Sequence, residues 1–87
     1  MIASLLVSLG FSYAMAGQAD KGIAMMERGI ARNDLKHPDD AKLHLGIAYL
    51  QAGKKNRGRE ILRTVRGADG TQDVARLWMI LSGGTGA

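Results

Sequence analysis

The sequence predicts an all-helical domain of about five helices, arranged as antiparallel hairpins that stack on one another. Three observations support this fold class. A stretch of the chain recurs after 36 residues, and glycines stand where helices would turn. The leucine, alanine and methionine content, with a single proline, also favours helices. The 87 residues suit one small domain, which we expect to span residues 1–82.

The recurring stretch covers residues 8–17 and 44–53, and five of its ten positions are identical. The coinciding residues are Leu9/Leu45, Gly10/Gly46, Tyr13/Tyr49, Ala16/Ala52 and Gly17/Gly53, followed by Gly22/Gly58 and by Met25-Met26 over Ile61-Leu62. The match also explains the apolar start of the chain. Although Ala14-Met15-Ala16 looks like a secretory cleavage site, no Lys or Arg precedes the apolar run, and the same segment recurs mid-chain.

Repeat one, residues 3–33, is expected to form a helical hairpin. Its first helix runs to about Ala16, and Gly17 breaks it. Its second helix carries Ile23, Met26 and Ile30 on one face. Residues 33–37 then connect this hairpin to the next one.

Repeat two, residues 38–67, is expected to form the second hairpin. Pro38 suits a first helical turn, where its missing N–H would be unpaired anyway, and acidic residues follow it at the positive end of the helix dipole. Gly53 ends this helix, and Lys54 and Lys55 make the turn. One face of the first helix carries Ala41, Leu45, Ala48, Tyr49 and Ala52, and the second helix, which stops near Gly67, carries Ile61, Leu62 and Val65.

A fifth helix is expected over residues 71–82, with Thr71 as its N-cap. Its apolar stripe consists of Val74, Leu77, Trp78 and Leu81. Stacked repeats need a terminal element that covers the last apolar face, and this helix fits that role. The composition of residues 83–87 predicts a flexible tail.

The repeated segment resembles the tetratricopeptide repeat. That family places Leu-Gly, then Tyr three residues after the Gly, then a turn Gly, then small residues in the second helix; the matching positions are Leu9-Gly10, Tyr13, Gly17 and Gly22, and Leu45-Gly46, Tyr49, Gly53 and Gly58. The family's early Trp is absent, with Leu6 and Lys42 in its place, and Val65 replaces a small residue. Other helix-hairpin repeats share such a pattern. The resemblance implies a short right-handed superhelix that binds protein partners.

In the tetratricopeptide family the first helix of each repeat lines a concave groove. The resemblance assigns this groove to Ser4, Val7, Phe11, Ala14 and Met15 in repeat one, and to Asp40, Leu43, Ile47, Leu50 and Gln51 in repeat two. The set is mostly apolar and contains no Lys, Arg or Asn that would clamp a peptide carboxylate. We therefore expect a partner helix or an extended hydrophobic peptide in the groove. Alternatively the chain fills its own groove, for instance with the helix of Trp78 over the repeat-two positions.

The first helix is apolar on every side, and such a helix is usually buried on every side. Two repeats and a cap are too few to cover it. We therefore expect it to meet a second copy of the chain, as in a two-fold dimer, or upstream repeats of a longer parent chain.

A basic segment offers an alternative function. Lys54, Lys55, Arg59, Arg63 and Arg66 form a patch that could bind nucleic acid or an anionic surface, although a solvated helix face is the simpler interpretation. Catalytic chemistry is not indicated. The chain has no cysteine, and its histidines, His37 and His44, have no third metal ligand nearby in sequence. We expect no enzyme activity, cofactor, metal site or membrane-spanning segment.

Overall fold

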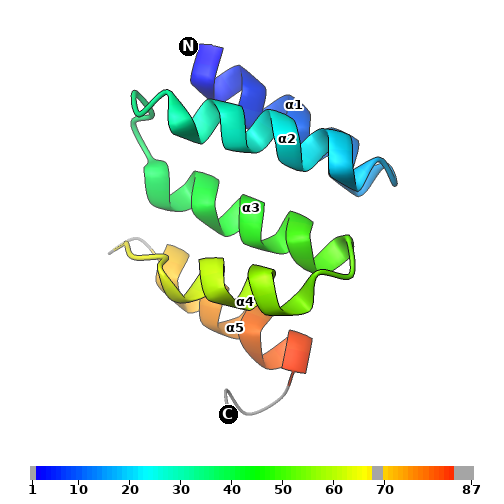
Figure 1. Cartoon of the computed structure of the whole chain (residues 1–87). Coiled ribbons are helices and arrows are strands. Elements are labelled where there is room, and N and C mark those ends of the chain that lie inside the picture. The colour runs from blue at the N-terminus through cyan, green and yellow to red at the C-terminus, as the bar shows by residue number, and fades with distance from the viewer. Residues whose placement is uncertain (1, 68–69, 84–87) are drawn as a thin grey trace.

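A computed structural model describes residues 2–67 and 70–83. This part of the chain contains five α-helices and no strand, which confirms the all-α prediction (Figure 1). The helices are α1 (Ile2–Met15), α2 (Ala19–Ala31), α3 (Pro38–Gln51), α4 (Lys55–Arg63) and α5 (Thr71–Gly83). Of the predicted tail, Gly83 belongs to α5, and the remaining positions lie outside the described residues.

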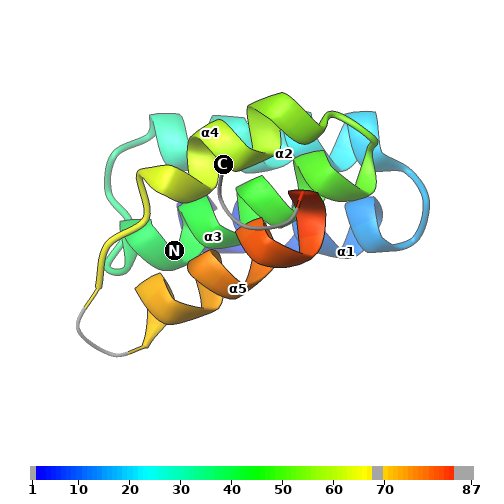
Figure 2. The ribbon, with the colours of Figure 1, turned by 90° about the horizontal axis from the view of Figure 1, so that it is seen from below.

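The helices lie in two layers. Helices α1, α3 and α5 form one layer, and α2 and α4 form the other (Figure 2). Helix α1 pairs with α2, and α3 pairs with α4, as the two predicted hairpins. Helix α3 also contacts α1 and α2, and α5 in turn contacts α3 and α4. The second hairpin therefore lies between the first hairpin and α5.

The two hairpins turn in the same way. Gly17 has a φ of +94° and Gly53 a φ of +80°, in the left-handed region that favours glycine. After each glycine the next backbone N–H reaches back to a tyrosine carbonyl, at 2.9 Å from Gln18 to Tyr13 and at 2.9 Å from Lys54 to Tyr49. This five-residue reach is the helix ending known as the Schellman motif. The repeated glycines thus specify the repeated turn.

The mid-helix glycines lie where two helices approach closely. A Cβ atom on Gly10 would lie 2.6 Å from the carbonyl oxygen of Gly22 on the paired helix. In the second hairpin a Cβ atom on Gly58 would lie 2.9 Å from the carbonyl oxygen of Gly46. Each pair of glycines therefore allows two helix backbones to pack almost directly on each other.

Two apolar clusters hold the stack together. The first joins the two hairpins through Val7, Ala14, Ile23, Met26, Ala41, Leu45, Ala48, Tyr49 and Ile61. The second joins the second hairpin to α5 through Leu43, Ile47, Leu62, Val65 and Ala75, with Trp78 and Met79 half-buried against it. Helix α5 therefore covers the last apolar face of the second hairpin.

The predicted details of α4 and α5 need correction. Helix α4 ends at Arg63 rather than near Gly67, and Lys55 belongs to the helix. Thr71 is the first residue of α5 rather than its cap. The packing face of α5 is centred on Ala75, which lets the helix approach closely. Of the predicted stripe only Trp78 is half-buried, and Val74, Leu77 and Leu81 are exposed.

Candidate functional site

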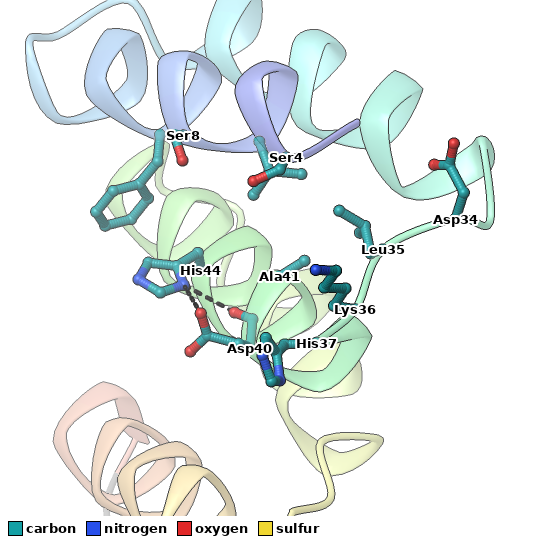
Figure 3. A pocket seen from close by; sticks show the side chains of 11 residues that line it. Ser4, Ser8, Asp34, Leu35, Lys36, His37, Asp40, Ala41 and His44 are labelled. Atoms are coloured by element: carbon teal, nitrogen blue, oxygen red, sulfur yellow. Dashed lines mark hydrogen bonds and ion pairs between the residues drawn. The ribbon is translucent and has the colours of Figure 1, made fainter. Parts of the chain in front are cut away.

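A groove of about 580 Å³ lies between α1, α3 and the connection that precedes α3 (Figure 3). This volume falls within the range of roughly 300–1,000 Å³ that is usual for ligand sites. The lining side chains are Ser4, Val7, Ser8, Phe11, Asp34, Leu35, Lys36, His37, Asp40, Ala41 and His44. Three segments of the chain therefore build one concave surface.

The α1 wall combines apolar and hydroxyl groups at helical spacing. Ser4, Val7, Ser8 and Phe11 recur three or four residues apart, so they share one side of α1. The Phe11 ring meets the His44 ring of α3 edge-on, with 4.7 Å between ring centroids and an interplanar angle of 84°. This contact joins α1 to α3 within the groove lining.

The connection between the hairpins forms the second wall. Asn33 has a φ of +60°, and asparagine is among the residues that tolerate this left-handed conformation. The turn leaves Leu35 packed against the core, with exposed Asp34 and Lys36 on either side. Charged side chains of both signs therefore flank an apolar anchor at the rim.

The α3 wall presents an imidazole whose orientation is fixed by the helix itself. Nδ1 of His44 lies 2.7 Å from the backbone oxygen of Asp40 and 3.9 Å from a carboxylate oxygen of the same residue. Because a carbonyl oxygen only accepts, Nδ1 donates this hydrogen bond. In the neutral ring Nε2 is then left as an acceptor.

The groove positions assigned by resemblance are only partly brought together. Four of them line the groove: Ser4, Val7, Phe11 and Asp40. Ala14 instead packs against Gly22 of α2. Met15 and Gln51 are exposed outside the groove lining.

Three of the five repeat-two positions are covered by α5. Leu43 and Ile47 are buried in the cluster that contains Ala75, and Leu50 is half-buried against it. The chain therefore covers these repeat-two positions with its own helix α5. This is the alternative in which the helix of Trp78 lies over repeat two. The open groove lies one step towards the N-terminus, between the hairpins.

Arg59 does not belong to the exposed basic patch that the sequence predicted, because the structure buries it. Its side chain is only 7% exposed, and its Nη1 donates to the Met79 backbone oxygen at 2.6 Å and to Ser82 Oγ at 3.0 Å. A charged residue is buried here because α5 supplies these acceptors. Lys54 pairs with Asp20 of α2 at 3.4 Å. Lys54 stays exposed in this pair, and Lys55, Arg63 and Arg66 are exposed as well.

A tyrosine of the repeat motif links the hairpins. The Tyr49 hydroxyl donates to Glu27 Oε2 of α2 at 2.6 Å, and the Arg57 guanidinium lies 5.8 Å from its ring centroid. Burial and the hydrogen bond to Glu27 raise the pKa of Tyr49 above its ordinary value of 10.0. Tyr49 is therefore neutral near neutral pH, and its hydroxyl remains a donor.

Sequence reasoning missed the groove residues contributed by the connection and by the second turn of each helix. These are Ser8, Asp34, Leu35, Lys36, His37, Ala41 and His44. Ser8 follows Ser4, and His44 follows Asp40, at a spacing of four, so periodicity could have found those two. The connection carries no such signal. Among residues 2–67 and 70–83, no three His, Asp or Glu side chains gather to hold a metal ion.

No helix in the described part of the chain combines the length and the apolar character needed to cross a membrane. Comparisons with known protein families, with curated proteins and with solved structures found no match.

Proposed function

We propose that this chain is a non-enzymatic protein-interaction module of the tetratricopeptide type, which binds a short extended peptide in the groove between α1 and α3. The observation that carries the proposal is the groove itself. Its volume of about 580 Å³ suits a few peptide residues, and apolar Phe11 and Leu35 are only half-buried at its surface. The repeated Leu-Gly, Tyr and Gly positions support the family assignment.

The chemistry of the lining defines the partner. Val7, Phe11, Leu35 and Ala41 offer an apolar floor for one anchoring side chain. Ser4 and Ser8 offer hydroxyl groups to a peptide backbone. An extended peptide with an apolar anchor fits these groups better than a helix, because the connection before α3 closes one side of the groove.

The charges at the rim favour a peptide over a nucleic acid. Asp34 and Asp40 are acidic, and Lys36 is basic. A groove of mixed sign attracts no polyanion, and the burial of Arg59 interrupts the basic segment of α4. We therefore expect peptide affinity to change little with salt, whereas nucleic-acid binding would weaken steeply as salt is added.

The module also self-associates through apolar surface outside the groove. Ile2, Leu5 and Leu9 of α1 are exposed, and large exposed apolar surfaces usually mark contact sites. This contact is separate from the peptide groove, because none of the three side chains lines it. Groove binding and self-association can therefore be tested independently.

A displayed library of short random peptides, followed by calorimetry on the enriched sequence, tests the groove. Ser8→Phe should fill the groove and abolish binding, because Ser8 is exposed on the α1 wall. Ala24→Phe, at an exposed position of α2, is the matched control and should bind like the wild type. Equal binding by both variants, or enrichment of no peptide at all, would contradict the proposal.

A further inference from the structure

The outer face of α1 is a continuous apolar strip. Ile2 is 58% exposed, Leu5 64% and Leu9 45%, and they recur at spacings of three and four residues. They lie opposite the side chains of α1 that pack on α2, because Ala3, Val7, Gly10 and Ala14 are buried on the other side. Helix α1 contains no charged residue to interrupt the strip. We call Ile2, Leu5 and Leu9 the α1 face.

The internal repeat indicates what the α1 face does. Shifted by 36 residues, Leu5 falls on Ala41 and Leu9 on Leu45. In α3 both of these positions are buried, at 4% and 7% exposure, against the preceding hairpin. Ile2 falls on Pro38, which is exposed, so the equivalence holds for two of the three residues. At Leu5 and Leu9 the α1 face is thus the repeat's own stacking surface, left exposed in the described structure. Its natural occupant is another helical element carrying an apolar strip.

The opposite end of the molecule carries such a strip. On α5, Val74, Leu77, Ile80 and Leu81 are between 42% and 68% exposed, on the side away from buried Ala75. We call these four residues the α5 face. All the large apolar side chains that are strongly exposed in the described part of the chain lie on α1 or α5. These helices lie at opposite ends of the stack, so one chain cannot join its own two faces (Figure 1).

We infer that a second copy of the chain stacks head to tail, with the α1 face of one copy on the α5 face of the next. The inference rests on the self-association proposed above and gives it a direction. A two-fold dimer through the α1 face would leave the α5 face in water, whereas head-to-tail contact covers both. Such a contact is heterologous, so each added copy leaves one free face at either end and the assembly grows with concentration.

Complementary blocked variants of the full chain test the direction. Leu5→Glu with Leu9→Glu blocks the α1 face, and Leu77→Glu with Leu81→Glu blocks the α5 face. All four positions are exposed, so both variants should keep the circular dichroism of the wild type. In sedimentation velocity each variant alone should be monomeric. An equimolar mixture should give a heterodimer that does not grow further, because each partner supplies the face that the other lacks.

The matched control places two glutamates at exposed α2 positions, Ala24→Glu with Ala31→Glu, and should assemble like the wild type. Self-association by the α5-blocked variant alone, with a monomeric α1-blocked variant, would show two-fold pairing through α1. That result would overturn the head-to-tail inference but not self-association. A wild type that stays monomeric at high micromolar concentration would overturn both.

Discussion

The two hairpins share their turn and their glycine positions, yet their helices cross differently. In the first hairpin a Cβ atom on Gly22 would clash with the backbone oxygen of Gly10 and lie 2.6 Å from the Ala14 nitrogen. In the second, a Cβ atom on Gly46 would first meet Leu62 Cδ2 at 2.7 Å, with backbone no nearer than 3.3 Å. Backbones meet at both crossings, since a Cβ atom on Gly58 would lie 2.9 Å from the Gly46 oxygen. The approach is tighter in the first hairpin, and the Leu62 side chain lies over Gly46 in the second.

The difference continues towards the open end of each hairpin. Gly29 keeps α2 close to α1, because a Cβ atom there would lie 2.7 Å from the Ala3 backbone oxygen. The equivalent residue is Val65, which is 1% exposed and packs in the cluster shared with α5. The first hairpin therefore relies on contacts within itself, and the second relies on its neighbour α5 as well. The same repeat motif is therefore compatible with close packing inside one hairpin and with packing against a neighbouring helix.

Gly22→Ala should have the largest effect on the free energy of unfolding. The added methyl group meets backbone atoms that cannot move alone, so the helices of the first hairpin must separate. We expect a loss of about 3 kcal/mol, the upper end for overpacked cores, despite the better helix propensity of alanine. Urea denaturation followed by circular dichroism measures this change. A loss no larger than that of Gly46→Ala would contradict the comparison.

Arg59→Ala should cost about 2 kcal/mol and act where the second hairpin meets α5, because it removes two hydrogen bonds to α5 and a buried aliphatic stem. Hydrogen exchange should speed up at α5 amides while α2 amides keep their protection. Arg63→Ala, at an exposed position of the same helix, is the control and should change little. Equal acceleration in α2 would show that the hairpins do not respond separately.

Tyr49→Phe should cost about 1.5 kcal/mol, because the hydroxyl that joins the hairpins bonds a carboxylate. Tyr13→Phe tests the equivalent tyrosine of repeat one. Its ring lies 4.6 Å from the Lys21 ammonium, and this contact survives the loss of the hydroxyl. In thermal unfolding, Tyr49→Phe should therefore have a lower melting temperature than Tyr13→Phe. Equal melting temperatures would show that the bond to Glu27 contributes nothing.

The same tyrosine predicts a pH dependence. Its folded-state pKa is raised above 10.0, so its contribution to stability is complete below pH 10 and is lost as the pH rises through the folded-state value. The stability difference between the wild type and Tyr49→Phe should therefore shrink above pH 10. Urea titrations at several alkaline pH values measure it. A difference that grows with pH would have the wrong sign.

Gly46→Ala should have the smallest effect, about 1 kcal/mol. The Leu62 side chain must shift, and part of that cost is offset by the better helix propensity of alanine. The same urea measurement as for Gly22→Ala applies. Gly46 corresponds to Gly10 rather than to Gly22, but both Gly22 and Gly46 face a glycine of the paired helix. Because both substitutions add one methyl group, the gap between their two values compares backbone contact at Gly22 with side-chain contact at Gly46.

The features predicted correctly from sequence are those with local causes. Gly17 and Gly53 specify their turns through a backbone conformation that favours glycine, and Pro38 begins α3, as its missing N–H indicated. Each of these signals acts within a few residues, so one sequence was enough to interpret it.

The features that were missed depend on distant partners. Helix α5 carries apolar residues on more than one side. Ala75 faces inward because it packs in one cluster with Leu43 and Ile47 of α3. Arg59 is buried because Met79, 20 residues away, offers a carbonyl oxygen. The groove exists because residues 34–37 lie against α1 and α3. Periodicity holds no information about such partners.

The position of Trp78 gives the molecule a built-in optical probe. It is the only tryptophan of the chain, and it lies half-buried where α5 meets the second hairpin. Its fluorescence should shift to longer wavelength when α5 leaves that surface, even while the first hairpin stays folded. Emission would therefore follow release of the terminal helix, and ellipticity would follow loss of the hairpins. The unmodified chain can thus show whether its two ends come apart together.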